Sequence, residues 1–395
     1  MKPDSLLEII SFLLPIAAAS GWFAAAKHYR RRPKSDGADR LTRTCLRSTD
    51  FLLAEKPEKA IDAFVDTLEE DCDTVETHIA LGNLFRRKGE MERAISIHQG
   101  LMGKPALHAE HRVRVLFELG MDYMRAGLLD RAEKTFTGLT QDRIHREPAL
   151  QQLLQIYQHE REWSKALECT RAIGMLGKIQ RGESVAQFHC ELAEEALAAG
   201  QAERAMGHVQ TALQQDDACV RASLQKARIE CSRKNYGLAL HTLKNIEKQN
   251  SAYVVEMIGP LRECYDYLGD AKEQVLYFQY LFDKYHPEAV MLILAELINQ
   301  SDGTEQAIAF LSGALAKQPS IKGMSHLIAL HKCRARADCH STLAELERLS
   351  VQLSTEKMCY QCTHCGFRGA ELHWQCPSCH HWETIKPMAC ALNAL

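Results

Sequence analysis

The chain has 395 residues, of which 46% are hydrophobic and 25% are charged, and its formal net charge is -3. This composition excludes a disordered or collagen-like chain, and the net charge provides no positive field that would draw the chain onto nucleic acid. The aromatic share of 7% and the 11 prolines favour helices over a β-sandwich, so an all-α protein is expected.

The first predicted element is an apolar helix at the N-terminus. Residues 9–26 carry no charge, and five basic residues follow between Lys27 and Lys34. About 20 apolar residues span the hydrocarbon core of a bilayer, so residues 1–26 are predicted to form a transmembrane anchor and residues 27–41 a basic juxtamembrane linker. The basic residues place the following chain in the cytoplasm. A cleaved signal peptide is the alternative, because residues 17–20 read AAAS, but the basic cluster opposes translocation.

A repeat with a period near 34 residues fills the middle of the chain. Six segments align on alanines at positions 60, 94, 132, 166, 205 and 239. Twelve residues before each alanine lies a mostly small residue: Ser48, Gly82, Gly120, Ala193 and Ala227, with Leu154 as the exception. Weaker units continue through Gln274, Ala295 and Ala307. This is the tetratricopeptide pattern, so residues 42–350 are predicted to form a superhelical solenoid of about nine helical pairs.

The spacing of small residues predicts how each helical pair packs. The two small positions are expected to face each other where the helices cross, so a bulky residue at Gly82 or Gly120 would force the helices apart. Glycines five residues before the alanine, at Gly89, Gly127 and Gly200, are expected in the turn between the helices. Such a solenoid offers a concave face to partner proteins. The sequence also lacks the HExxH, Walker and GxSxG motifs, which favours a non-enzymatic protein.

The last predicted element is a four-cysteine metal module at residues 351–395. Cys362 and Cys365 form one CxxC pair, and Cys376 and Cys379 form a second. Two such turns can place four thiolates around one tetrahedral metal ion. Zinc is preferred, and iron is the alternative because tetrahedral thiolates suit both metals.

A fifth cysteine makes the register of the first pair ambiguous. Cys359 and Cys362 also form a CxxC pair, but Gly366 directly follows Cys365 and can supply the positive φ that such a turn needs. We therefore expect Cys359 to be a spare thiol. Four cysteines also make the nearby histidines unnecessary as ligands; these are His364, His373, His380 and His381.

Three roles are open to this module. Structural zinc is the default, because so short a segment cannot bury a sufficient core of its own. Iron at the same thiolates would make it an electron carrier. Nucleic-acid binding is disfavoured, because Arg368 is the only Lys or Arg in residues 359–382. Trp374 and Trp382 are expected either to cover the metal or to dock the module against the end of the solenoid.

Several segments, from the anchor to the tail, match the pattern of one known family. LLPIAAASGW lies in the apolar helix, FLLAEKPEKAIDAF and DYMRAGLLDRAEKTF lie in the repeats, and CTHCG and HWQCPSC lie in the tail. In these segments the chain resembles the lipopolysaccharide assembly protein B family. The resemblance covers nearly the whole chain and implies a membrane-anchored tetratricopeptide solenoid with a rubredoxin-like tail. It also implies that the four paired cysteines bind the metal.

The resemblance further implies a non-enzymatic adaptor that regulates lipopolysaccharide synthesis. Such an adaptor would promote degradation of the lipid A pathway deacetylase (LpxC) by the membrane AAA-type protease FtsH. It would sit in the bacterial inner membrane as a single-pass protein, with its N-terminus in the periplasm and its C-terminal domain in the cytoplasm. Two alternatives stay open: a scaffold that assembles other lipopolysaccharide synthesis or transport proteins at the inner membrane, and a rubredoxin-like electron carrier.

Overall fold

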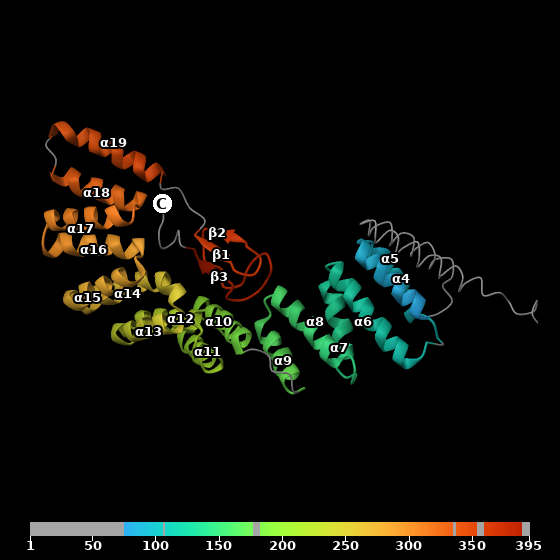
Figure 1. Ribbon diagram of the computed structural model, residues 1–395. Coiled ribbons are helices and arrows are strands. Elements are labelled where there is room, and N and C mark those ends of the chain that lie inside the picture. The colour runs from blue at the N-terminus through green and yellow to red at the C-terminus, as the bar shows by residue number, and fades with distance from the viewer. Residues whose placement is uncertain (1–74, 106, 177–181, 335–336, 354–358, 389–395) are drawn as a thin grey trace, which may run out of the picture. The chain divides into compact units, whose positions relative to one another are not determined.

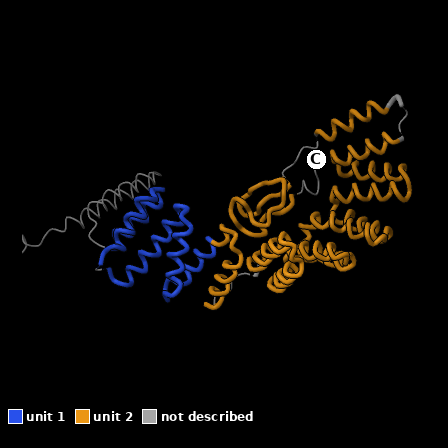
Figure 2. Tube along the Cα trace, turned by 180° about the vertical axis from the view of Figure 1, so that it is seen from behind, with its two compact units in different colours: residues 1–156 blue, residues 157–395 orange. Residues whose placement is uncertain are grey.

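The computed structural model describes residues 75–105, 107–176, 182–334, 337–353 and 359–388. The predicted anchor, the basic linker and the first repeat with its alanine at position 60 lie outside these residues. Among the helices that the structure describes, none is both long and apolar enough to cross a membrane. The chain divides into two compact units, one up to residue 156 and one from residue 157 (Figure 2).

The described residues form sixteen α-helices, and within each unit successive helices pack in pairs (Figure 1). The first unit holds α4 (Val75–Lys88), α5 (Met91–Met102), α6 (Ala109–Arg125), α7 (Leu129–Leu139) and most of α8 (Arg146–His159). The second unit holds α9 (Trp163–Gly174), α10 (Gly182–Ala198), α11 (Ala202–Gln215), α12 (Val220–Ser232), α13 (Tyr236–Gln249), the 3-10 helix η1 (Ser251–Tyr253), α14 (Val254–Leu268), α15 (Ala271–Tyr285), α16 (Glu288–Ser301), α17 (Thr304–Lys317), α18 (Ile321–Arg334) and α19 (Ala337–Leu353). The predicted tetratricopeptide fold is confirmed.

The repeated positions of the sequence occupy the core and the turns of these pairs. The alanines at 94, 132, 166, 205, 239 and 307 are completely buried, and Gln274, which takes the same place in its unit, is 3% exposed. The predicted turn glycines have φ between 73° and 89°, a region that other residues rarely adopt. These are Gly89, Gly127 and Gly200. The period therefore marks both the buried helix contacts and the turns between helices.

The first small position of a repeat packs against a ring. A Cβ atom on Gly82 would lie 2.5 Å from the His98 ring, and one on Gly120 would lie 2.8 Å from the Phe136 ring. Each ring belongs to a residue four positions after the repeated alanine, which is about one helical turn. The glycine thus makes room for a large side chain of the partner helix, which the spacing of small residues alone did not indicate.

His98 also links α5 to α6 through a buried contact with Asp122. Its Nδ1 atom lies 2.5 Å from Asp122 Oδ2, and both side chains are fully buried. Arg86 approaches the same carboxylate at 2.8 Å and Glu118 at 2.6 Å. Removing one member of such a buried network leaves an uncompensated charge, so the network holds α4, α5 and α6 in register.

The first helices of successive pairs in the second unit form one layer, here called the inner layer. Within it α10 contacts α12, α12 contacts α14, α14 contacts α16, and α16 contacts α18. The metal module lies against this layer, close to α10 and α12, in both views of the trace (Figures 1 and 2). Its strands β1 (Tyr360–Cys362), β2 (Arg368–Gly369) and β3 (Ile385–Pro387) form an antiparallel sheet in the order β2-β1-β3.

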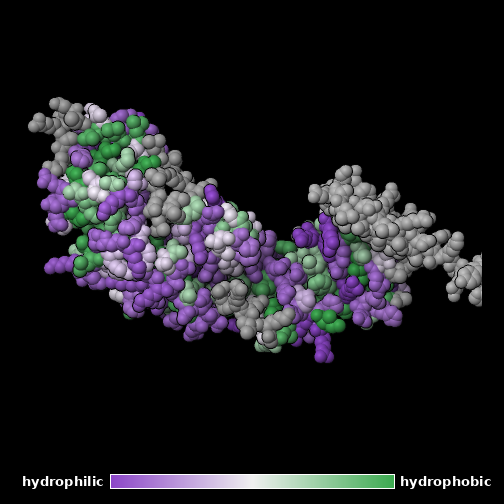
Figure 3. All heavy atoms as spheres, viewed as in Figure 1, coloured by the Kyte–Doolittle hydropathy of each residue, from purple (hydrophilic) through white to green (hydrophobic). Residues whose placement is uncertain are grey.

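Hydrophobic side chains form a surface patch at the end of the helical array, besides single exposed ones elsewhere on the described helices. Figure 3 shows them gathered over the end that carries α18 and α19, while hydrophilic side chains cover much of the remaining viewed face. Leu346, Leu349 and Val351 of α19 are exposed. A terminal repeat has no following helix pair to cover its outer face, which explains this exposure.

We expect Gly82→Ala to destabilise the first two pairs by about 1–3 kcal/mol, because the new Cβ displaces the His98 ring and with it the contact to Asp122. Hydrogen exchange of the α4 and α5 amides measures this local opening. Gly100→Ala is the control in α5, since a Cβ there meets nothing within 4 Å, and it should slow exchange slightly. Equal exchange in the two variants would contradict this packing.

Candidate metal centre

The metal module is built from two similar cysteine turns. In the first, the Gly366 amide donates to the Cys362 carbonyl at 3.0 Å, and Gly366 has the predicted positive φ of 78°. In the second, the His380 amide donates to the Cys376 carbonyl at 2.9 Å, and His380 has φ 56°. The two turns share one geometry although a histidine takes the place of the glycine in the second. This geometry turns both cysteines of each pair toward one point.

The turns bring four cysteine sulfurs together. The Sγ atoms of Cys362, Cys365, Cys376 and Cys379 all lie within 4.8 Å of one another. The Sγ atoms of Cys362 and Cys379 are 3.7 Å apart, and those of Cys365 and Cys376 are 3.6 Å apart. Four sulfurs in a tetrahedron around zinc, each bonded at about 2.3 Å, would be separated by about 3.8 Å. The donor set therefore fits one metal ion.

Cys359 lies outside this group, as the sequence predicted. Its carbonyl accepts a hydrogen bond from the Met388 amide at 2.8 Å, directly next to the pairing of β1 with β3. The main chain at this position extends the sheet before the first cysteine turn. The structure thus distinguishes the two overlapping CxxC pairs. Cys362 and Cys365 form the turn, whereas the segment from Cys359 to Cys362 contains β1.

The surroundings of the sulfurs favour a bound cation. Burial raises the pKa of the Cys362 thiol, but hydrogen bonds with the Thr384 hydroxyl and the amides of Cys365 and His364 outweigh it and lower the pKa to about 5. The His381 amide lowers the pKa of Cys379, but burial and the neighbouring thiols raise it to about 12. Several thiolates this close repel one another, and a metal cation removes that repulsion.

Two of the four histidines also approach the cysteines. The rings of His364 and His381 stack at 3.9 Å, and these two residues with Cys379 form a second set of donor atoms within 4.8 Å. The two sets share Cys379. The second set has only three members and is more exposed than the first. The four sulfurs are the more complete tetrahedral donor set.

Aromatic rings dock the module onto the second unit. The Trp382 ring lies 5.9 Å from that of Trp163 and 6.1 Å from that of Phe188, edge to face in both cases. The Trp374 ring lies 5.5 Å from that of Tyr253. The prediction that these tryptophans dock the module is confirmed. The predicted place, the end of the solenoid, is wrong, because the partner rings belong to α9, α10 and η1 in the interior of the array.

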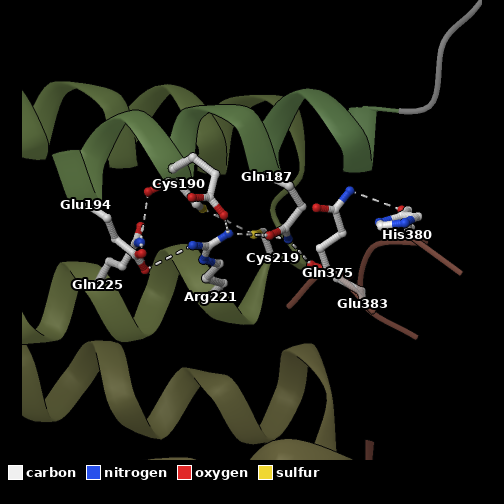
Figure 4. Close-up of polar contacts among 10 residues, drawn as sticks. Gln187, Cys190, Glu194, Cys219, Arg221, Gln225, Gln375, His380 and Glu383 are labelled. Atoms are coloured by element: carbon white, nitrogen blue, oxygen red, sulfur yellow. Dashed lines mark hydrogen bonds and ion pairs between the residues drawn. The ribbon is translucent and has the colours of Figure 1, made fainter. Parts of the chain in front are cut away.

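Hydrogen bonds between the solenoid and the module hold the module in the same position. The Tyr253 hydroxyl donates to the Ile385 carbonyl at 3.0 Å, and the Tyr360 hydroxyl donates to Glu256 Oε1 at 2.7 Å. Gln187 of α10 points toward the module, and its amide donates to Glu383 Oε1 at 2.5 Å (Figure 4). None of these solenoid residues belongs to the repeated pattern. The period of the repeat therefore could not have identified these residues.

Replacing one of the four grouped cysteines should remove the metal. We expect Cys376→Ser to lose most of the single ion per chain, since an alcohol is a poor substitute for a thiolate in a four-sulfur site. Elemental analysis of the purified full chain measures the stoichiometry. Cys359→Ser is the matched control and should keep one ion per chain. Loss of the ion from the control, or its retention in Cys376→Ser, would contradict the four-sulfur site.

Two family models match parts of the chain. Residues 360–387 match the family described as a rubredoxin metal binding domain, and residues 77–112 match the tetratricopeptide repeat. A solved tetratricopeptide repeat protein from Parabacteroides merdae covers 69% of this chain and 98% of its own, at 16% identity and a TM-score of 0.32.

Two curated relatives match almost end to end. Lipopolysaccharide assembly protein B of Escherichia coli K12 is 37% identical over 384 residues, which is 97% of this chain and 98% of the relative. The protein of the same name from Haemophilus influenzae is 32% identical over 394 residues, with 97% and 99% covered. At this identity and coverage, the chain belongs to the lipopolysaccharide assembly protein B family.

Proposed function

We propose that the chain is a non-enzymatic adaptor of the bacterial inner membrane that regulates lipopolysaccharide synthesis. It would do so by promoting degradation of the lipid A pathway deacetylase by the FtsH protease. The observation that carries the proposal is the end-to-end similarity to relatives named for lipopolysaccharide assembly. Their name supports a role in lipopolysaccharide assembly, and the delivery of the deacetylase to the protease is our more specific inference.

The architecture supports an adaptor, because an adaptor needs binding surfaces and a location. Residues 1–26 would anchor the solenoid in the inner membrane, with the rest of the chain in the cytoplasm. An anchor of this kind raises the effective concentration of the solenoid near a membrane protease. We assign contact with FtsH to the anchor and its basic flank, and contact with the deacetylase to the inner layer of the second unit.

We further propose that Cys362, Cys365, Cys376 and Cys379 bind one zinc ion with a structural role. The ion would hold the two cysteine turns together and so preserve the face that carries Trp382. A short module without its own large core depends on such ligation. The metal would thus maintain a protein surface without taking part in a reaction.

Deleting the chain should lengthen the half-life of the deacetylase in growing cells, and wild-type chain supplied in trans should restore it. The double variant Cys362→Ser, Cys376→Ser should fail to restore it, because the module loses its metal. Cys333→Ser, a change at an exposed thiol of α18, is the control and should restore it fully. A pulse-chase measurement of the deacetylase half-life distinguishes these outcomes. An unchanged half-life after deletion would instead favour the scaffold that assembles lipopolysaccharide proteins.

The exposure of Cys365 favours a second candidate, a rubredoxin-like electron carrier, because an exposed sulfur would bring a bound iron close to a redox partner. We expect protein purified without added metal to be colourless and to contain zinc. Visible absorption from sulfur-to-iron charge transfer, bleached by a reductant, would contradict the structural role and support the carrier.

A further inference from the structure

Two cysteine thiols lie close together between neighbouring helices of the inner layer. Cys231 belongs to α12 and Cys264 to α14, and their Sγ atoms are 3.4 Å apart. A disulfide bond joins two sulfurs at about 2.05 Å, so a modest approach of the two side chains would close the gap. Because α12 and α14 pack against each other, such a bond would join two successive units of the solenoid.

One of the two thiols is open to small molecules. Cys231 is half-buried and lines a hollow of about 530 Å³, whose wall also contains residues of α10 and α14. Cys264 is completely buried. A small reagent that enters the hollow therefore meets Cys231 first, and Cys264 takes part only through its contact with Cys231.

The surroundings also give the two sulfurs different roles. Burial raises the pKa of Cys231 and a hydrogen bond with Cys264 opposes this rise, while Glu263 and Glu230 add to it. At Cys264, burial and the contact with Cys231 act in the same direction and raise the pKa to about 12. Cys231 is thus the nucleophile of the pair, and Cys264 is the resolving thiol that donates to it. Because both pKa values are raised, the pair stays reduced until an oxidant accumulates.

We propose that Cys231 and Cys264 form a reversible disulfide modification site whose oxidant is hydrogen peroxide. The Cys231 sulfur attacks one peroxide oxygen and becomes a sulfenic acid, while the O–O bond breaks and the other oxygen leaves with the thiol proton as water. The Cys264 sulfur then attacks the Cys231 sulfur. The S–O bond breaks, and the departing hydroxyl takes the Cys264 proton as a second water. Two thiols lose two electrons, and one peroxide is reduced to two waters.

The disulfide fixes α12 to α14 beside the metal module, because Trp374 of the module lines the same hollow as Cys231. Oxidation therefore stiffens this part of the inner layer. In the cytoplasm, where the proposed function places this unit, dithiol reductants return such a bond to thiols, so the modification is transient. The reaction itself requires neither the adaptor role nor the metal.

A second pair of thiols provides a matched control. Cys190 of α10 and Cys219, which directly precedes α12, have their Sγ atoms 3.9 Å apart. Both of these side chains are completely buried. This pair has a similar separation of sulfurs but no accessible thiol to react first. Peroxide should therefore leave it reduced for longer than the pair of Cys231 and Cys264.

The test treats the reduced full chain in detergent with hydrogen peroxide, blocks the remaining thiols with N-ethylmaleimide and maps linked peptides by mass spectrometry without reductant. The peptide that joins Cys231 to Cys264 should form about tenfold faster than the one that joins Cys190 to Cys219. Dithiothreitol added before blocking should abolish it. Absence of this peptide, or earlier linkage of Cys190 to Cys219, would overturn the proposal. Each linkage is identified by its mass, so oxidation of the metal-site cysteines does not obscure the result.

Two single variants test the order of attack. In Cys264→Ser, oxidation of Cys231 should stop at the sulfenic acid, which dimedone labels. In Cys231→Ser, the buried Cys264 should give about tenfold less dimedone adduct. More adduct at Cys264 than at Cys231 would overturn the proposed roles. Peptide mapping of the wild-type chain decides even where a variant does not fold.

Hydrogen exchange tests the effect of the bond on the helices. After peroxide treatment, the α12 and α14 amides of the wild-type chain should exchange more slowly than those of Cys231→Ser treated in the same way. This comparison cancels any loosening that follows from oxidation of the metal site. Equal exchange in the two proteins would overturn the proposed stiffening.

Discussion

The C-terminal module depends on four sulfurs being held at one point. Its fully enclosed apolar core is small: Cys362, Cys376 and Ile385 are buried, and few other side chains pack against them. Such a core cannot offset the conformational entropy of ordering the segment. Ligation by one metal supplies what is missing, and it does so at the two turns that carry the cysteines. The position of β3, Trp374 and Trp382 follows from those turns.

The solenoid holds the same module from the other side. Trp382 packs against Trp163 and Phe188, while the Tyr253 hydroxyl binds the main chain of β3. Metal ligation and aromatic docking therefore stabilise the same position of the module against the solenoid. The module packs against the second unit, and Trp374 lines a hollow together with side chains of α12 and α14.

The sequence predicted the features that repeat and the features with fixed spacing. The tetratricopeptide pairs, their turn glycines and the grouping of four cysteines without Cys359 all follow from local patterns. The docking site could not be predicted in this way. Its residues Trp163, Phe188 and Tyr253 belong to no repeated pattern and lie far from the module in the sequence. The partner of Gly82 was missed for a related reason: His98 is a large side chain at a position where the repeat has no fixed residue.

We infer that the metal maintains the inner layer as well as the module. Hydrogen exchange of the full chain, compared before and after complete metal removal by a chelator, tests it most directly. We expect faster exchange in β1 and β3 and also in α10, α12 and η1, with α4 to α7 unchanged. Unchanged exchange in α10 and α12 after complete loss of the metal would contradict it.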